Sequence, residues 1–398
     1  MKDILMVTHF TQVPGEKGNS RFKYIAELVS EKDVSLEVVT TKFSHREKTN
    51  RNIKKEDLEL LKYKLTMIDE PGYKKNVSIK RFYSHYIMSR NLSKYLRNRK
   101  EPDLIYCSIP SIDVAYVVAK YANKNNIRLI IDIQDLWPEA FKMVLNIPIV
   151  SDFVFKPMEY KANYVYKSAD TIISVSETYG RRATKVNKNC KDIKSVFLGT
   201  DFKYFDSIEV DKNIVKNKNE IWITYIGTLG HSYDIPVVID ALNIVNEKGI
   251  KNIKFLVIGD GPLKNKFEDY AKEKNVDVSF FGRLAYEKMV QYLKVSDIAV
   301  NPIVKGSAGS IINKVGDYAA AGLPVLNTQE NYEYRKLIED FNCGINCKNS
   351  DAIDLSNKII YLYNDGKLMK DMGKNNRKLG TIKFDRSETY KKIVETII

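Results

Sequence analysis

A loop of small residues followed by a helix makes positions 301–328 the first candidate for chemistry. We predict a loop at 306–310 and a helix from about Asn313 to Ala321, ended by Gly322. Free backbone N–H groups and the positive end of the helix dipole both point outward at such a helix start, which suits an anion such as phosphate. The alternative is an ordinary strand, loop and helix packed on a sheet, because glycine-rich loops are common.

Asp317 is the residue of this helix with the clearest chemical use. It lies one turn after Asn313 and Lys314, so its carboxylate projects near the helix start. A carboxylate there can accept hydrogen bonds from a vicinal diol such as that of a ribose. The stretch therefore places a candidate phosphate site and a candidate ribose site close together.

Short apolar strands alternate with helices in both halves of the chain, which indicates an α/β architecture with parallel sheets. Helices are predicted at 21–30, at 387–397 and from the loop after 103–107 to Tyr121. We predict strands at 4–7, 36–40, 103–107, 129–133, 171–175, 221–226, 255–258, 278–281, 298–302 and 344–346. A polar segment at 207–220 marks a linker between the halves.

Ligands collect at the carboxyl ends of strands in parallel sheets, so residues just after a strand are candidates for a site. Asp135 and Trp137 follow the strand at 129–133. Gly18 and Asn19 stand just before the helix at 21–30, where small residues permit close backbone approach. A GxGxxG motif is absent there, so these two residues alone are a weak signal.

Length and composition bound the class of protein. The chain has 398 residues, enough for about two domains, and 44% are apolar. No apolar run approaches the roughly 20 residues that span a bilayer, and the start, MKDILMVTHF, lacks the pattern of a secretory signal. The four cysteines are too few and scattered for a disulfide framework or a zinc site, so we expect a reducing cytosol.

Positive charge is concentrated in the first half. Residues 1–205 carry 36 Lys and Arg against 24 Asp and Glu, whereas residues 206–398 carry 28 against 26. Most of the excess lies at 42–100, where cations alternate with aromatic and aliphatic residues, a pattern that suits an anionic bilayer or a lipid pyrophosphate. A solvated, lysine-rich face is the alternative. Nucleic acid is not expected, because no zinc-finger, ribonucleoprotein or heptad-linked basic motif is present.

Two motifs resemble those of glycosyltransferase family 4, whose members are retaining enzymes with the GT-B fold. GDYAAAGLPV, at 316–325, is similar to the second half of the family's Glu-x7-Glu signature, and Asp317 stands where the second Glu binds ribose. The run at 259–262, GDGP, matches a tight turn of the family. The resemblance covers nearly the whole chain, and its N-terminal pieces are weaker.

The sequence departs from the family pattern in the donor half. Gly309 replaces the first Glu, and the segment 227–232 lacks the Arg and Lys with which many relatives hold the diphosphate. The first departure matches a bacterial sub-branch, typical of capsule and O-antigen loci, with Asn-Lys before an acidic-Tyr pair. Here these pairs are Asn313-Lys314 and Asp317-Tyr318.

The resemblance implies a donor site with cations from other positions. We favour Lys314 and Lys305 for the pyrophosphate over Arg283, with a solvated surface lysine as the alternative for Lys305. The expected donor-binding residues are Gly18, Asn19, Gly227, Thr228, Gly261, Arg283, Lys305, Ser307, Gly309, Ser310, Ile311 and Asp317. The expected catalytic residues are Asp135, Lys314 and Asp317.

The sequence DIQDLWPE, at 132–139, resembles the DLWP motif of bacterial family members that transfer N-acetylated amino sugars or deoxyamino sugars. Many relatives have a His after this strand, but this chain has Gln134, which cannot act as a base. Asp135 is then the candidate that orients or deprotonates the acceptor hydroxyl. A helix N-cap or turn aspartate is the alternative for Asp135.

The resemblance also implies the domain plan: two Rossmann-like domains that face a cleft, with a C-terminal crossover helix. We expect an acceptor-binding domain at 1–205, on which 384–398 packs back, and a nucleotide-sugar domain at 206–383. No carboxylate pair or Asp-x-Asp indicates a metal, so we expect metal-independent transfer without a cofactor. Front-face attack through an oxocarbenium-like ion pair would give retention, as the family implies.

The expected function is retaining transfer of a sugar from a UDP donor to a polyprenyl-pyrophosphate-linked saccharide. The sugar we favour is an N-acetylhexosamine or its 6-deoxy form, in bacterial capsule, O-antigen or lipopolysaccharide biosynthesis. The protein would then be cytoplasmic and peripheral on the inner face of the cell membrane. Binding to anionic liposomes should fall when Lys80, Arg81, Arg90 and Lys94 are neutralised.

Two alternatives belong to other classes. Gly309 and the missing Arg and Lys pair allow a non-catalytic GT-B subunit that binds a partner. A UDP-sugar 2-epimerase shares the architecture, but it needs carboxylates and histidines placed for proton abstraction. The four histidines form no such motif, although His9 and His231, each just after the first strand of a half, can still face the cleft.

Overall fold

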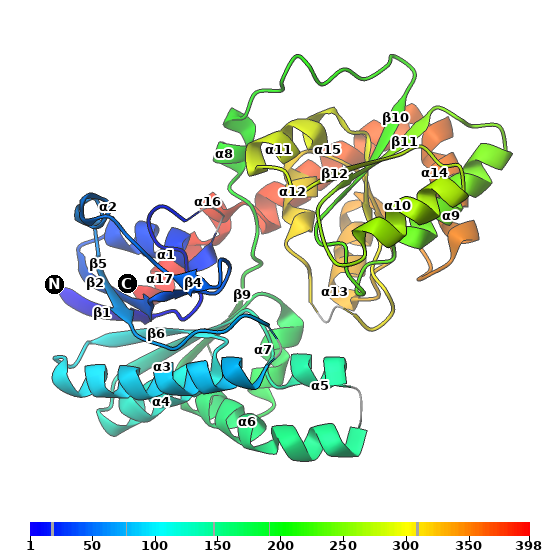
Figure 1. Cartoon of the computed structure of the whole chain (residues 1–398). Helices are drawn as coiled ribbons and strands as arrows, with labels where there is room; N and C mark the ends of the chain where they lie inside the picture. Colours follow the sequence, from blue (N-terminus) through cyan, green and yellow to red (C-terminus); the bar gives the residue numbers. More distant parts are fainter. Residues whose placement is uncertain (17–19, 77, 146–147, 191, 308–309) are drawn as a thin grey trace. The chain divides into compact units, whose positions relative to one another are not determined.

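The chain divides into two units, each built on its own parallel sheet. Unit 1 comprises Met1–Val196 and Tyr390–Ile398, and unit 2 comprises Phe197–Thr389. The expected boundaries, 205/206 and 383/384, lie within about ten residues of these. The structure, a computed structural model, describes all residues except 17–19, 77, 146–147, 191 and 308–309 (Figure 1).

The sheet of unit 1 has seven parallel strands in the order β5-β2-β1-β6-β7-β8-β9. Its strands are β1 (Lys2–Val7), β2 (Val34–Thr41), β5 (Lys64–Ile68), β6 (Leu104–Ile109), β7 (Arg128–Ile133), β8 (Thr171–Ser174) and β9 (Asp192–Ser195). A small antiparallel hairpin, β3 (Phe43–Ser44) and β4 (Thr49–Asn50), follows β2. Ile4 to Val7 are all buried, because helices cover both faces of such a sheet.

Two groups of helices cover this sheet. The helices of unit 1 are α1 (Arg21–Ser30), α2 (Lys55–Glu59), α3 (Ile79–Asn98), α4 (Ile112–Lys124), α5 (Glu139–Leu145), α6 (Pro148–Ser168), α7 (Glu177–Thr184) and α17 (Lys391–Ile397). α3, α4 and α6 lie side by side (Figure 1). α17 packs against α1, and its Ile393 and Ile397 enter one apolar core with β1, β2 and β6.

Unit 2 repeats the design with six parallel strands in the order β12-β11-β10-β13-β14-β15. Its strands are β10 (Ile221–Ile226), β11 (Ile253–Ile258), β12 (Val278–Gly282), β13 (Ile298–Asn301), β14 (Val325–Asn327) and β15 (Gly344–Asn346). Its helices are α8 (Phe202–Ser207), α9 (Ile235–Glu247), α10 (Lys264–Glu273), α11 (Tyr286–Val295), α12 (Lys314–Ala320), α13 (Tyr332–Phe341), α14 (Ala352–Asn364), α15 (Gly366–Lys383) and α16 (Arg386–Thr389).

Each face of this second sheet has its own apolar core. α9, α10 and α14 contribute to one core, and α8, α11, α12 and α13 contribute to the other. Because both faces are covered, ligands can reach the sheet only at strand ends, which is where α12 begins. Among the described residues, no helix combines the length and the apolar character that crossing a bilayer requires.

Candidate functional site

Lys314 is the first residue of α12, and its ammonium group is buried inside unit 2. The residue is 8% exposed, and its Nζ has no hydrogen-bond partner among the described residues. Nζ lies 3.9 Å from the centroid of the Tyr225 ring and 4.0 Å from that of Tyr233. Burial lowers the pKa of this ammonium well below its usual range, because a low-dielectric site disfavours the charged form. A buried amine without a partner is a strong candidate for a group that meets a ligand.

Glycine turns bring backbone close to this amine. Gly227 follows β10 with a φ of 137°, and a Cβ built there would lie 2.8 Å from Lys314 Nζ. A Cβ at Gly259 would lie 1.7 Å from the Gly227 carbonyl oxygen, and one at Gly261 would lie 2.3 Å from that of Leu229. The turns after β10 and β11 therefore touch backbone to backbone, which requires glycine. Of the predicted residues, Gly227 lies directly against Lys314, and Gly261 belongs to the adjoining turn.

Asp317 lies one turn further along α12 and is already hydrogen-bonded within unit 2. Its Oδ1 accepts hydrogen bonds from Thr200 Oγ1 and Tyr286 OH, each 2.9 Å long. Burial raises the pKa of Asp317, although the two hydroxyl groups oppose this shift by stabilising the carboxylate. A Cβ at Gly316 would lie 2.9 Å from Thr200 Oγ1, so the helix approaches this segment closely. The residue predicted to bind ribose is thus a carboxylate that two protein hydroxyls hold in place.

The other predicted cations of unit 2 differ from Lys314 in exposure. Lys305 and Arg283 are both exposed, and neither forms an ion pair or a side-chain hydrogen bond with another described residue. Thr228 is exposed, and its carbonyl oxygen accepts a hydrogen bond of 2.7 Å from Tyr225 OH. Lys305 therefore has the surroundings of a solvated surface lysine as well as those of a free ligand-binding cation.

The loop before α12 contributes backbone more than side chains. Ser307 N–H donates to the Val304 carbonyl over 3.0 Å, and the Ser310 carbonyl accepts from Gln329 Nε2 over 2.7 Å. Ile311 is 5% exposed and belongs to the apolar core around α12, so only its backbone is available to a ligand. Gly309 lies outside the described residues.

Asp135 of unit 1 makes the contacts of a turn residue. Its Oδ1 accepts from the Leu136 N–H over 2.9 Å, and its Oδ2 accepts from Trp137 Nε1 over 3.1 Å. Burial raises its pKa, which suits a proton acceptor, although the bonds from Trp137 and Leu136 oppose the shift. The geometry fits both a turn aspartate and a group that orients an acceptor. Gly18 and Asn19, the other predicted residues of this half, lie outside the described residues.

The sequence analysis missed a buried polar cluster in unit 1. His9 Nε2 lies 2.8 Å from Glu70 Oε1, and Ser84 Oγ donates to Glu70 Oε2 over 2.5 Å. Burial alone would raise the pKa of Glu70, but the hydrogen bonds from His9 and Ser84 hold it at about 2. The His85 ring stands edge-on to that of His9, with centroids 4.7 Å apart, and His45 Nδ1 lies 2.5 Å from Tyr73 OH.

Strand ends contained a signal for this cluster. His9 follows β1, Glu70 follows β5 and Trp137 follows β7. Because the carboxyl ends of parallel strands lie at the same edge of a sheet, these positions alone indicate that the three residues lie close together. The prediction omitted β5, and Glu70 was therefore not placed at the edge of the sheet. Without Glu70, no hydrogen-bond partner for His9 could be predicted, so the cluster was not recognised.

Three residues of the same cluster are of types that can bind a metal ion. Among the described residues, His9, Glu70 and His85 bring ligand atoms within 4.8 Å of one another. However, after burial, the positive charges of Arg81 and Lys48 contribute to lowering the pKa of His85, and cations that disfavour a proton also disfavour a metal ion. The residues present therefore fit a metal poorly.

The basic helix predicted in segment 42–100 is α3, and it is less uniform than expected. Lys80, Arg90 and Lys94 are exposed, as a membrane-facing surface needs. Arg81 is 9% exposed and donates through Nη1 to the Asn76 carbonyl oxygen over 2.6 Å. Grouping Arg81 with the membrane-facing cations was therefore wrong, because its side chain points into unit 1.

Comparison with known proteins assigns the donor half of the chain. Residues 206–379 match the family model described as "Glycosyl transferases group 1". This segment, which is less than half of the chain, is similar to group 1 glycosyltransferases. The matched range falls inside unit 2 and includes Lys314, Asp317 and the glycine turns.

Two sequence relatives of this chain are distant. It is 24% identical over 239 residues to MJ1069, an uncharacterized glycosyltransferase of Methanocaldococcus jannaschii. The aligned residues make up 59% of this chain and 60% of the relative. It is 25% identical over 174 residues, 43% of the chain and 46% of the relative, to a Campylobacter jejuni protein. That protein is named GalNAc-alpha-(1->4)-GalNAc-alpha-(1->3)-diNAcBac-PP-undecaprenol alpha-1,4-N-acetyl-D-galactosaminyltransferase. The chain thus spans less than two thirds of either relative.

Solved structures match this chain over nearly its full length. HepE of Anabaena, in complex with UDP, has a TM-score of 0.71 at 14% identity and covers 100% of this chain and 99% of its own. WaaG, a glycosyltransferase involved in lipopolysaccharide biosynthesis, has a TM-score of 0.66 at 15% identity and covers 99% of each chain. The fold is therefore GT-B, with parallel sheets of seven and six strands.

Proposed function

We propose that this protein is a glycosyltransferase that moves a sugar, with retention, from a UDP donor to a polyprenyl-pyrophosphate-linked saccharide. The sugar we favour is an N-acetylhexosamine or its 6-deoxy form. The reaction would serve bacterial surface polysaccharide assembly, of the capsule, O-antigen or lipopolysaccharide kind, with the protein peripheral on the inner face of the membrane. The donor would bind unit 2 and the acceptor unit 1.

The unpaired amine of Lys314 is the observation on which the proposal rests. Burying an ammonium without a partner is costly, and the two tyrosine rings beside it only partly offset that cost. A diphosphate at the Gly227 turn would bring the missing negative charge to within reach of Nζ. Lys314 would then replace the Arg and Lys that segment 227–232 lacks.

The chemistry of transfer needs such a group. The C–O bond between the anomeric carbon and the diphosphate breaks, and negative charge develops on the departing oxygen. Fixed donors at that oxygen accelerate the step, because they need no reorganisation when the charge appears. Lys314 would supply one donor, and the backbone N–H groups of the loop before α12 would supply others. Asp317, held by Thr200 and Tyr286, would accept from the ribose diol of the donor.

Relatives support each half of the proposal. HepE of Anabaena binds UDP and UDP-glucose, which supports a UDP donor. The Campylobacter jejuni relative is named for transfer of N-acetylgalactosamine to an undecaprenyl-pyrophosphate saccharide, which supports the acceptor and the sugar. The excess of cations at 42–100 supports an anionic, membrane-bound acceptor.

Nucleotide binding tests the donor assignment. We expect UDP to raise the melting temperature, because a ligand at 100 times its Kd stabilises the folded state by about 2.7 kcal/mol. GDP should give little shift. Stabilisation by GDP but not by UDP would overturn the donor, and hydrolysis of UDP-N-acetylglucosamine no faster than background would favour a non-catalytic subunit.

A further inference from the structure

Two cations of unit 1, Arg81 and Lys48, form no ion pair with a described residue. Arg81 of α3 is 9% exposed, and its Nε has no hydrogen-bond partner within that part of the chain. Lys48 lies between β3 and β4. Its Nζ donates to Asn76 Oδ1 over 2.5 Å and lies 3.4 Å from His45 Nδ1. Neither cation forms an ion pair with a described residue, so their positive charge remains available to a ligand.

The nearest carboxylates of unit 1 are engaged elsewhere. Glu70 is bonded to His9 and Ser84, and Asp135 is bonded to the Trp137 indole and to a backbone N–H. The site therefore combines fixed positive charge with acceptors that are already satisfied, which favours an anion over a cation.

Aromatic faces line the cation pair. The Arg81 guanidinium carbon lies 4.7 Å from the Trp137 ring centroid, 5.6 Å from that of Tyr73 and 5.8 Å from that of Phe10. Lys48 Nζ lies 4.8 Å from the Tyr73 centroid. Such faces hold a cation in place without neutralising it. The guanidinium is therefore fixed in place while its charge stays free of an ion pair, which suits a contact with a phosphate oxygen.

Neighbouring positive charges contribute to lowering the pKa of two basic groups here, His45 and Lys48, whereas Asp135 and Glu70 partly oppose the effect of burial on Arg81. Burial, followed by the charges of Lys48 and Arg81, lowers the pKa of His45 to about 4. Burial lowers the pKa of Arg81, and burial together with Arg81 lowers that of Lys48. An anion bound among these groups would relieve the repulsion, which is a second reason to expect a negatively charged ligand.

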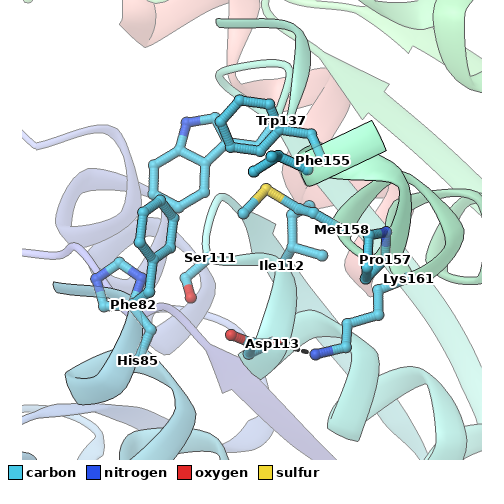
Figure 2. A pocket seen from close by; sticks show the side chains of 11 residues that line it. Phe82, His85, Ser111, Ile112, Asp113, Trp137, Phe155, Pro157, Met158 and Lys161 are labelled. Atoms are coloured by element: carbon cyan, nitrogen blue, oxygen red, sulfur yellow. Dashed lines mark hydrogen bonds and ion pairs between the residues drawn. The ribbon is translucent and has the colours of Figure 1, made fainter. Parts of the chain in front are cut away.

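An apolar cavity of 260 Å³ has Trp137 in its wall (Figure 2). The Arg81 guanidinium lies over the ring of the same Trp137, so the cavity adjoins the cation pair. Its wall includes Phe82, Ile112 and Met158, and Val154, which is 57% exposed, lies among the lining residues. Two polar atoms at this cavity, His85 Nε2 and Ser111 Oγ, are buried without a hydrogen-bond partner among the described residues. The cavity thus offers apolar surface and unused hydrogen-bonding groups beside the positive charge. Its remaining polar lining is the Asp113–Lys161 ion pair, 2.6 Å long (Figure 2).

We propose that this region binds a phosphorylated ligand with an apolar part. The phosphate or diphosphate lies on Arg81 and Lys48, and the apolar part enters the cavity beside Trp137. On the proposed function, the ligand is the lipid-linked acceptor, with its diphosphate at the cation pair and the start of its hydrocarbon chain in the cavity. A free phosphate compound shares the anionic half of this chemistry and lacks the apolar half.

Calorimetric titration with three probes separates these sources. Inorganic pyrophosphate, farnesyl diphosphate and farnesol are titrated into the full chain in the presence of saturating UDP, so that the donor site is occupied. We expect both diphosphates to bind, farnesyl diphosphate at least tenfold more tightly than pyrophosphate, and farnesol weakly. Equal affinity for the two diphosphates would overturn the role of the cavity and point to a free phosphate ligand.

Substitutions locate the anion. Arg81→Gln and Lys48→Gln should each raise the Kd for pyrophosphate at least tenfold. Arg90→Gln, an exposed position on the same helix, makes the same charge change and should leave the Kd unchanged. Lys48 is partly exposed, so its variant stays informative if Arg81→Gln unfolds. Unchanged affinity in both Arg81→Gln and Lys48→Gln would overturn the proposal.

A second pair of substitutions tests the cavity. Met158→Asp should remove the advantage of farnesyl diphosphate over pyrophosphate, because a carboxylate enters the apolar wall. Tyr160→Asp, at an exposed position of the same helix, is the control and should keep the advantage. An advantage that persists in Met158→Asp would contradict placement of the apolar part here.

Two variants distinguish a failure of this proposal from a failure of the proposed function. Lys314→Met should lose UDP binding and keep farnesyl diphosphate binding, whereas Arg81→Gln should do the reverse. If Lys314→Met loses UDP but Arg81→Gln keeps farnesyl diphosphate, this inference is wrong and the donor site stands. If Arg81→Gln loses farnesyl diphosphate but Lys314→Met keeps UDP, the donor assignment is wrong and the anion site in unit 1 stands.

Discussion

At the scale of single residues, Lys314 shows how one buried amine can link donor binding to protonation. Burial lowers its pKa because the charged form loses hydration, and the faces of Tyr225 and Tyr233 return only part of that energy. A diphosphate at Gly227 would favour the ammonium and raise the pKa again. Binding of the donor should therefore take up a proton wherever the pH lies between the two values.

Proton uptake is the first prediction. Between pH 7.5 and 9, UDP is fully ionised, because the second phosphate pKa is about 6. A proton taken up by the protein on binding makes affinity fall as pH rises through this window. Calorimetry in two buffers of different ionisation enthalpy should show net proton uptake on binding, and Lys314→Met should show less uptake than the parent. Binding enthalpies that do not depend on the buffer would contradict the coupling.

Asp317 supplies the second prediction. Its Oδ1 is fixed by Thr200 and Tyr286, so the carboxylate is positioned before the donor arrives. Asp317→Ala should lower kcat/KM for the donor roughly 10- to 150-fold, because a hydrogen bond to a charged group is worth about 1.5–3 kcal/mol. Glu287→Gln, at an exposed position next to Tyr286, is the control and should change little. Full turnover in Asp317→Ala would remove Asp317 from the site.

At the scale of elements, the glycine turns decide where Lys314 can lie. Gly227→Ala should destabilise the protein by about 1–3 kcal/mol and weaken UDP binding, because its φ of 137° suits glycine and the new Cβ would lie 2.8 Å from Lys314 Nζ. Gly230→Ala is a matched control, since the nearest atom to its Cβ would be 3.7 Å away. Denaturant unfolding and UDP titration of both variants measure the difference. Equal effects would show that the turn does not position the amine.

Sequence periodicity predicted the central elements well. Arg21–Ser30, Ile221–Ile226 and Gly344–Asn346 have the predicted bounds, because caps, turns and apolar runs all agree there. The helix predicted at 387–397 is instead α16 and α17, separated at Tyr390, the first residue that returns to unit 1. A helical stripe specifies which residues are buried but not that two different units bury them.

The residues that lie around Lys314 in unit 2 were easier to anticipate from the sequence than those around Arg81 in unit 1. Lys314 and Gly227 were both candidates from the sequence, because Lys314 lies beside a family motif and Gly227 follows a strand end. The neighbours of Arg81 could not be anticipated, because no strand was predicted at β5, Lys64–Ile68, which is a five-residue strand at the edge of the sheet. Without β5, Glu70 and Tyr73 have no assigned place, and Arg81 looks like one more exposed cation of a basic helix.

At the scale of the whole molecule, the uneven charge has a measurable consequence. The net charge is +14, and residues 1–205 hold most of it, with 36 cations against 24 anions. We expect the protein to bind anionic liposomes and to release them as salt rises, because the attraction is screened within about a Debye length. The triple variant Lys80→Gln, Arg90→Gln and Lys94→Gln should bind several-fold more weakly in a sedimentation assay.

A charge-matched control separates this surface from net charge alone. Lys218→Gln, Lys266→Gln and Lys272→Gln remove the same three charges from exposed positions of unit 2. Liposome binding of this control should remain close to that of the parent. An equal loss in both triple variants would mean that net charge, and not the face of α3, drives the interaction.

The central claim is that Lys314 is kept buried and unpaired so that it can meet the donor diphosphate. The most direct measurement is the thermal unfolding of the parent and of Lys314→Met, each with and without UDP. We predict that the variant without UDP melts above the parent, because a buried unpaired polar group costs about 1–3 kcal/mol, and that UDP no longer raises its melting temperature. A variant that responds to UDP as strongly as the parent would contradict the account.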